Sequence, residues 1–149
     1  MDRTENTLEQ DMQICFQAMQ AMDNAYESYA RKNGLTYMSL YILETIYEKN
    51  GCTQKQIAEI TLYPKQTVHM VIRSFIEKGW VVLEQTQQDR RNKHVRLTES
   101  GELFARQIIE PYWEAGQRAF SELGAETRGI MTRALKTFVH SFAEKTEQL

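Results

Sequence analysis

The stretch TQKQIAEITLYPKQTVHMVIRSFIEKGWVVL, residues 53–83, contains the signals that decide the fold. Thr53 and Gln56 have the spacing of a capping box, in which a side chain at each end satisfies a free backbone N–H, and this predicts a helix start. Pro64 follows soon afterwards. Because proline is tolerated in a first helical turn but not inside a helix, it ends one short helix and begins another.

The second of these helices has two contrasting faces. It is predicted from about Lys65 to Lys78, since Gly79 then provides a C-terminal stop. Apolar residues at helical spacing predict its buried face, and they are Val68, Val71, Ile72, Phe75 and Ile76. The positions that remain are mostly polar and are predicted to be exposed; they include Gln66, Thr67, His69, Met70 and Arg73.

After Gly79 the hydrophobic period changes from that of a helix to two. Val81 and Leu83 alternate with other residues, and Val95 and Leu97 do so further on. This pattern predicts two short strands of a hairpin, with Gln85–Lys93 as the loop between them. The loop and the second strand are rich in cationic side chains, namely Arg90, Arg91, Lys93 and Arg96.

Charge is unevenly distributed along the 149 residues, whose formal net charge is −2. Residues 1–52 carry 4 Lys and Arg against 8 Asp and Glu, residues 53–98 carry 8 against 4, and residues 99–149 carry 6 against 8. A basic middle between acidic ends is expected when only the middle meets a polyanion. A solvated surface rich in Lys and Arg is the alternative interpretation.

Both ends of the chain predict long helices with apolar stripes. A helix over about residues 5–32 carries a seam with alternating steps of four and three: Leu8, Met12, Cys15, Met19, Met22, Tyr26 and Tyr29. Another helix follows Thr98 to about Leu123, with a kink or break expected near Pro111. After Gly124 a last helix repeats the spacing with Met131, Leu135, Phe138 and Phe142. A small domain would struggle to bury these stripes, which favours a shared homodimer interface.

The order of elements is that of a winged helix-turn-helix, a mainly α fold with a small β-hairpin. An α-helix fits the major groove of B-DNA, and a cationic loop can reach the minor groove or the phosphates. We therefore expect a single winged-helix domain over residues 1–149, with a DNA-binding core of about 36–98. Dimerisation helices are expected over about 5–33 and 99–147.

Several short motifs resemble those of the MarR family of bacterial regulators. The wing signature matches at Asp89-x-Arg91, followed after five residues by Leu97-Thr98 and then by Gly101. Thr67-Val68 and Glu77–Val81 are similar to the family's recognition helix and first wing strand. The resemblance covers almost the whole chain. It implies a homodimer that binds a pseudo-palindromic operator in double-stranded DNA, usually as a repressor released by a small-molecule effector or by oxidation.

The resemblance also assigns residues. Arg91 matches the wing arginine that enters the minor groove, and Asp89 matches the acid that orients it. Met70 departs from an arginine often found in the family, so the preferred base sequence does not carry over. The expected DNA-binding residues are Lys65, Gln66, Thr67, His69, Met70, Arg73, Asp89, Arg90, Arg91 and Lys93.

Two further features bear on regulation. One branch of the family senses organic peroxides through a cysteine in the first helix, and Cys15 with nearby tyrosines is similar in type. Cys15 also lies on the apolar stripe, where a cysteine is a small buried side chain. Cys52 has no visible activating group and is expected to be structural. Tyr37, Tyr41 and Trp113 are candidates for an effector pocket, although core packing is the alternative.

Other functions find little support in the sequence. His69, His94 and His140 lie on three different predicted elements, and there is no glycine-rich phosphate loop, so we expect no enzyme activity. A metal site using His69 and His94 would compete with the DNA face, and we expect neither metal nor cofactor. The acidic start lacks a signal peptide, and no apolar run could span a membrane, which predicts a cytoplasmic protein without membrane contact. A winged helix that binds only protein is the competing class.

Overall fold

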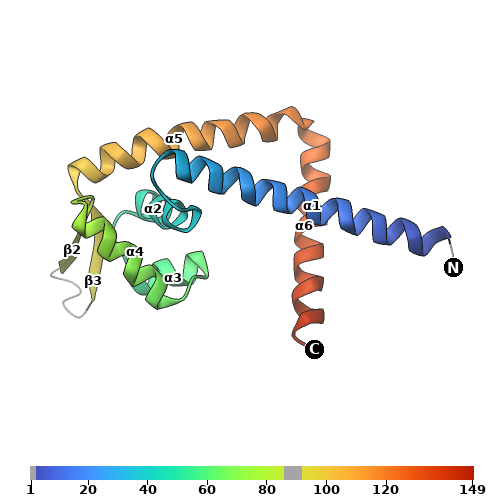
Figure 1. The fold of residues 1–149 in the computed structure, drawn as a ribbon, viewed down its shortest axis with the longest axis horizontal. Helices are drawn as coiled ribbons and strands as arrows, with labels where there is room; N and C mark the ends of the chain where they lie inside the picture. The colour runs from blue at the N-terminus through green and yellow to red at the C-terminus, as the bar shows by residue number, and fades with distance from the viewer. Residues whose placement is uncertain (1–2, 86–91) are drawn as a thin grey trace. The chain divides into compact units, whose positions relative to one another are not determined.

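The computed structural model describes residues 3–85 and 92–149, with side chains from residue 7 onward. Figure 1 shows a mainly helical chain with one small sheet, as predicted. The elements in chain order are α1 (Arg3–Lys32), α2 (Tyr37–Lys49), β1 (Cys52–Thr53), α3 (Gln54–Thr61), α4 (Lys65–Glu77), β2 (Val81–Gln85), β3 (Lys93–Leu97), α5 (Glu99–Glu122) and α6 (Gly124–Thr146).

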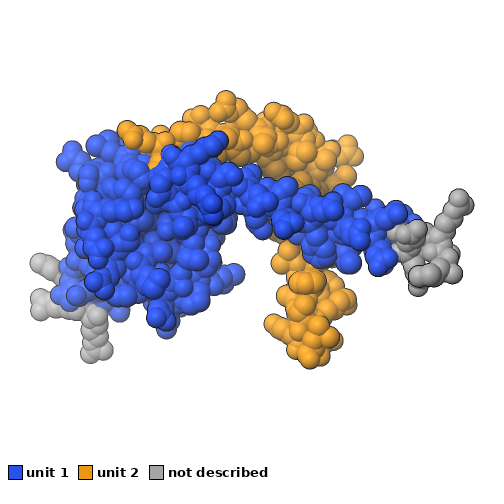
Figure 2. All heavy atoms as spheres, in the orientation of Figure 1, with its two compact units in different colours: residues 1–106 blue, residues 107–149 orange. Residues whose placement is uncertain are grey.

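The chain divides into two compact units, coloured separately in Figure 2. Residues 1–106 form the first unit and residues 107–149 the second, so the division falls inside the continuous helix α5. The first unit contains α1 to α4 and the sheet. It therefore holds every element that the sequence assigns to DNA binding.

Local capping signals position the helices around the first unit. Gly34 has φ +73°, the left-handed conformation that ends α1. Thr36 then caps α2, since its hydroxyl accepts a hydrogen bond from the backbone N–H of Ser39 at 3.1 Å. The predicted capping box is confirmed: Thr53 and Gln56 each accept a hydrogen bond from the other's backbone N–H.

The turn between α3 and α4 is tight. Leu62 follows α3 with φ +59°, which is a strained conformation for a residue with a branched side chain, and it is 88% exposed. Pro64 is the N-cap of α4, and Gly79 lies just after its end with φ +73°. The predicted boundaries of this helix are therefore confirmed to within a residue.

The sheet has three antiparallel strands in the order β1-β3-β2. Val81 pairs with Leu97 and Leu83 with Val95, which confirms the predicted hairpin. Cys52 in β1 pairs with Val95 from the other side. The sequence did not indicate β1, because two residues are too few to display an alternating pattern.

The core of the first unit forms between α2, α3, α4 and the sheet. Each element contributes apolar side chains from one face, as expected for layers that share one core. Fully buried side chains are Leu40, Ile42, Leu43, Ile46, Ile57, Val68, Ile72, Phe75, Val81 and Val95. This core holds α3 and α4 against each other as a helix-turn-helix and attaches the hairpin beside them.

The second unit consists of the end of α5 and all of α6. The sequence predicted a kink or a break near Pro111. The break is wrong, since α5 continues through this residue, and the kink stays a prediction. Pro111 and Gln107 are both exposed, so water can solvate the Gln107 carbonyl that lacks a helical N–H partner. Helix α6 has no buried residue along its described length. Its exposed apolar side chains are Ile130, Met131, Leu135, Phe138, Val139 and Phe142.

Within residues 3–85 and 92–149, none of the helices has the length and apolar character that crossing a bilayer requires.

Candidate nucleic-acid interface

The buried and exposed faces of α4 are separated largely as the sequence predicts, but Ile76, which was predicted to be buried, is 40% exposed, and Val71 is half-buried. Val68, Ile72 and Phe75 are buried with at most 1% exposure, and they hold the helix on the core. The opposite side presents Lys65, Gln66, His69, Met70 and Arg73 to solvent. Because a helix with one free polar face can enter a major groove without leaving the core, this face is the candidate recognition surface.

Thr67 differs from the other expected contacts. It is half-buried rather than exposed. Its position explains this, because Thr67 lies one turn before the half-buried Val71 and next to the fully buried Val68. Met70 is 61% exposed and projects an apolar side chain from the centre of the surface. An apolar side chain there suits contact with a thymine methyl group rather than a hydrogen bond.

Arg73 does not stand alone on this surface. Its Nε lies 3.1 Å from Oε1 of Glu77, one turn further along α4, and both side chains are largely exposed. An exposed pair at this spacing stabilises the fold by about 0.3–0.5 kcal/mol. Its main effect is on geometry, because the carboxylate limits the directions in which the guanidinium can point.

A hydrogen bond between side chains connects the two helices of the helix-turn-helix. Nδ1 of His69 lies 3.2 Å from Oε1 of Gln54, the first residue of α3. His69 is exposed and Gln54 half-buried. The imidazole is therefore held at a defined place on the recognition surface.

The strands of the wing are described, but the tip of its loop is not. Lys93 begins β3 and is exposed. Asp89, Arg90 and Arg91, which the sequence assigns to DNA binding, lie outside the described residues. Arg96 lies on β3, with its Nε 3.1 Å from Oε2 of Glu84 on β2.

Side chains of β3, the central strand, also contact the turn before β1. His94 Nδ1 lies 2.6 Å from the carbonyl oxygen of Gly51, within hydrogen-bonding distance. The Arg96 guanidinium lies so close to Gly51 that a Cβ there would be 3.1 Å from its central carbon. Gly51 has φ +108°, which also favours glycine. These contacts fix the base of the wing to the end of α2.

A second cluster joins the end of α4, the wing and the start of α5. The Thr98 hydroxyl donates a hydrogen bond to the Gly79 carbonyl at 2.6 Å, and the Thr98 N–H donates to the Trp80 carbonyl at 2.9 Å. The hydroxyl of Ser100 also donates to Gly79, at 3.1 Å. The N–H of Gly101 donates to the Thr98 hydroxyl at 3.0 Å. The recognition helix and both ends of the hairpin are therefore tied at one point.

Aromatic packing supports the same cluster. The Trp80 ring stacks on Phe104 with centroids 3.8 Å apart and lies 5.7 Å from Phe75 in the core. The ammonium of Lys78 lies 4.6 Å from the centroid of the Trp80 ring, within the range of a cation–π contact. The sequence contains Trp80, Thr98 and Gly101 within recognisable motifs, but it did not indicate that these residues come together to orient the wing.

Comparisons with known proteins agree with this geometry. A sequence profile described as MarR family matches residues 33–92. The transcriptional regulator SarZ of Staphylococcus epidermidis is 25% identical over 140 residues, which are 90% of this chain and 91% of SarZ. A MarR family regulator from Neisseria meningitidis is 23% identical, with a TM-score of 0.70 and 99% of both chains covered.

The chain resembles the MarR family in sequence over residues 33–92, and it has the fold of a MarR family regulator along nearly its whole length. Its winged helix-turn-helix fold is also that of AbfR from Staphylococcus epidermidis. Reduced AbfR bound to DNA is 23% identical, with a TM-score of 0.67, and covers 93% of this chain and 99% of its own. AbfR has also been solved with a disulfide.

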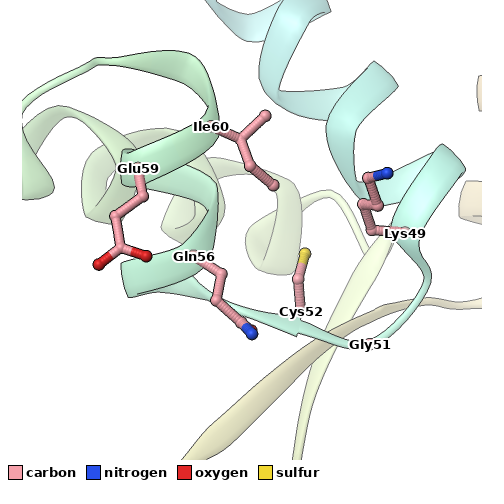
Figure 3. A pocket seen from close by; sticks show the side chains of 6 residues that line it. All are labelled: Lys49, Gly51, Cys52, Gln56, Glu59 and Ile60. Atoms are coloured by element: carbon pink, nitrogen blue, oxygen red, sulfur yellow. The ribbon is translucent and has the colours of Figure 1, made fainter.

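The two cysteines of this protein have different surroundings. Cys15 is exposed on α1 in the single chain. Cys52 is 8% exposed and lines a pocket together with Lys49, Gln56, Glu59 and Ile60. Figure 3 shows its thiol pointing toward the space between Ile60 and Lys49. Burial raises the pKa of the Cys52 thiol, with a smaller opposing effect from Lys49, so the reactive thiolate is disfavoured there.

The tyrosines expected to line an effector pocket pack on one another. Tyr37 stacks on Tyr26 at 5.1 Å and on Tyr41 at 6.3 Å, and Tyr41 meets the edge of Tyr63 at 6.2 Å. Burial, together with the neighbouring rings, raises the pKa of Tyr37 to about 12. Trp113 is half-buried in the second unit. The role of these residues in effector binding stays a prediction.

The histidines considered as metal ligands have other contacts. His69 faces Gln54 and His94 faces Gly51. Among residues 7–85 and 92–149, no group of three or more His, Cys, Asp or Glu side chains could hold a metal ion.

Proposed function

We propose that this protein is a MarR-family transcriptional regulator that acts as a homodimer, binds a pseudo-palindromic operator and represses transcription until a small-molecule effector releases it. The observation that carries the DNA-binding part is the exposed face of α4, with Lys65, Gln66, His69 and Arg73 beside a hairpin wing. We assign α4 to the major groove and the wing loop, including Asp89, Arg90 and Arg91, to the adjacent minor groove.

Electrostatics support this assignment. Residues 53–98 contain 8 cationic against 4 acidic side chains, although the whole chain has a formal net charge of −2. DNA binding depends on neutralising phosphates, and the released counterions make it strongly salt-dependent. A basic segment confined to the helix-turn-helix and wing would direct DNA to that surface and away from the acidic ends.

The terminal helices support the homodimer. The large apolar side chains of α6 are 37% to 55% exposed, and no residue of this helix is buried. Leu8 and Met12 on α1 are exposed by 72% and 47%. Isolated amphipathic helices gain little stability without a surface to pack on, and a second copy of the same helices supplies a matching apolar surface.

Dimerisation would also set the spacing of the two recognition helices. Successive major grooves on one face of B-DNA are about 34 Å apart. An effector that changes the distance between the two copies of α4 would therefore weaken operator binding without touching the bases. This mechanism predicts that effector and operator reduce each other's affinity by the same factor.

DNA binding is tested by measuring affinity for duplex DNA at several salt concentrations. The logarithm of the affinity should fall linearly with the logarithm of salt concentration. Arg91→Ala should weaken binding and lower the slope by about one, whereas Arg118→Ala, the same change on α5, should leave both unchanged. A weak or salt-independent interaction, or no effect of Arg91→Ala, would favour a winged helix that binds only protein.

The homodimer is tested by sedimentation equilibrium. The unmodified chain should have twice the mass of one copy. Leu135→Lys places a charge in the apolar stripe of α6 and should shift the equilibrium toward monomer, while Lys136→Ala on the adjacent exposed position should not. A monomeric unmodified chain would contradict the proposal.

A second candidate is a repressor that senses peroxide through Cys15. The exposed thiol on α1 favours it, as do the reduced and disulfide forms of the similar protein AbfR. An organic hydroperoxide would then release DNA from the unmodified protein and from Cys52→Ser, but not from Cys15→Ser. Release from all three proteins, or from none, would contradict this candidate and leave the effector-controlled repressor.

A further inference from the structure

The hydrogen bond between His69 and Gln54 has a chemical consequence for recognition. Nδ1 of His69 lies 3.2 Å from the amide oxygen of Gln54. An amide oxygen can only accept a hydrogen bond, so the bond requires a proton on Nδ1. A neutral imidazole has one ring proton, which leaves Nε2 with a free lone pair and makes it an acceptor.

The acceptor atom lies on the surface assigned to DNA. His69 is exposed on α4, three residues after Gln66 and four before Arg73, so these three side chains share one face of the helix. In the major groove, adenine presents an amino donor beside its N7 acceptor, and cytosine presents an amino donor. Guanine presents two acceptors, and thymine presents one acceptor and a methyl group. An acceptor Nε2 therefore favours adenine or cytosine as the base that it contacts on one strand.

We propose that Gln54 is a specificity-determining residue that acts through His69. By holding the proton on Nδ1, it makes Nε2 an acceptor and biases one position of the operator toward adenine or cytosine. Gln54 lies at the start of α3, outside the recognition helix, and needs no contact with DNA for this role. The inference rests on the proposed placement of α4 in the major groove.

A structural role is the competing explanation for the same bond. A tie between α3 and α4 could simply stabilise the helix-turn-helix. Loss of such a tie would weaken binding to all sequences alike or lower the stability of the fold. If Gln54 instead sets the tautomer of His69, loss of the bond would change which base is preferred at one operator position. The identity of the preferred base is therefore the decisive measurement.

The experiment selects bound duplexes from a random pool with the full-length protein and compares the base preferred at each operator position. In Gln54→Glu, a carboxylate accepts from Nδ1 and favours the doubly protonated imidazolium, whose Nε2 is a donor. One position should shift from adenine or cytosine toward guanine, by roughly tenfold or more in relative affinity. Gln54→Ala should make the preference there nearly equal, since either tautomer then forms.

Two controls separate chemistry from folding. Gln56→Glu introduces the same charge in the first turn of α3, where a glutamate is compatible with the capping box, and it should leave base preference unchanged. Gln54→Glu should fold normally, because a negative charge is favourable at a helix N-terminus. In a His69→Ala background, Gln54→Glu should no longer alter base preference.

The outcomes are distinct. If Gln54→Glu selects the same base as the unmodified protein, or if His69→Ala changes no base preference, the role of Gln54 in specificity is refuted while DNA binding by the protein stands. If the unmodified protein enriches no duplex at any salt concentration, the proposed DNA-binding function fails and this inference fails with it.

Discussion

Replacing Gly101 with alanine should destabilise this protein, because the backbone of Trp80 occupies the space that a side chain would need. A Cβ on Gly101 would overlap the carbonyl oxygen of Trp80 and lie 2.7 Å from its carbonyl carbon. Backbone atoms cannot rotate away as the end of a flexible side chain can. The same carbonyl accepts the hydrogen bond from the Thr98 N–H, so any shift also disturbs the base of the wing.

Three effects set the magnitude. Overpacking of this kind costs about 1–3 kcal/mol, and weakening the Thr98 hydrogen bond costs about 1 kcal/mol more. Alanine recovers about 1 kcal/mol relative to glycine inside a helix. The free energy of unfolding should therefore fall by about 1–3 kcal/mol in Gly101→Ala.

Gly116 provides a matched control on the same helix. A Cβ at Gly116 would meet nothing within 4 Å, so alanine should raise the free energy of unfolding by about 0.5–1 kcal/mol. Urea unfolding at one fixed protein concentration measures both variants, since dimerisation makes apparent stability depend on concentration. If Gly101→Ala proves as stable as Gly116→Ala, the contact with Trp80 does not constrain this position.

Three further predictions concern the strained, titratable and buried residues of the first unit. Leu62→Gly should raise the free energy of unfolding by about 0.5–1 kcal/mol, because glycine adopts φ +59° without the strain of an L-residue. Urea unfolding measures this change, and a lower midpoint in the variant would contradict the prediction. Burial raises the pKa of Tyr37 to about 12 in the folded protein, whereas a tyrosine in an unfolded chain has a pKa of about 10. The stability that the neutral ring contributes is therefore complete below about pH 10 and is lost as the pH rises through about 12. The unfolding midpoint should accordingly fall over this range, and fall less in Tyr37→Phe; equal curves would contradict the assignment. In Cys15→Ser, the remaining thiol of Cys52 should react slowly with a thiol reagent in the folded protein and faster in urea. Burial limits the access of the reagent to this thiol and raises its pKa. A fast reaction in the folded protein would show that the pocket admits reagents freely.

The resemblance in sequence and the local signals together led to most of the fold and to the candidate surface. Pro64, Gly79 and the Thr53–Gln56 capping box act within one helical turn, so their effects could be predicted without knowing what packs against them. The change of hydrophobic period after Gly79 likewise indicated the wing. The terminal stripes indicated surfaces that one copy leaves exposed, and α6 does expose its apolar residues.

Tertiary structure decided the features that join residues distant in the chain. Gln54 meets His69, Thr98 meets Gly79, and His94 meets Gly51 across separations of 15, 19 and 43 residues. No period or spacing marks such partners, because they depend on how α3, α4 and the strands pack. The same packing half-buries Thr67 and makes Gly101 a contact site for Trp80. Sequence therefore determined which elements form and which face of α4 is polar, while packing determined how that face and its histidine are held.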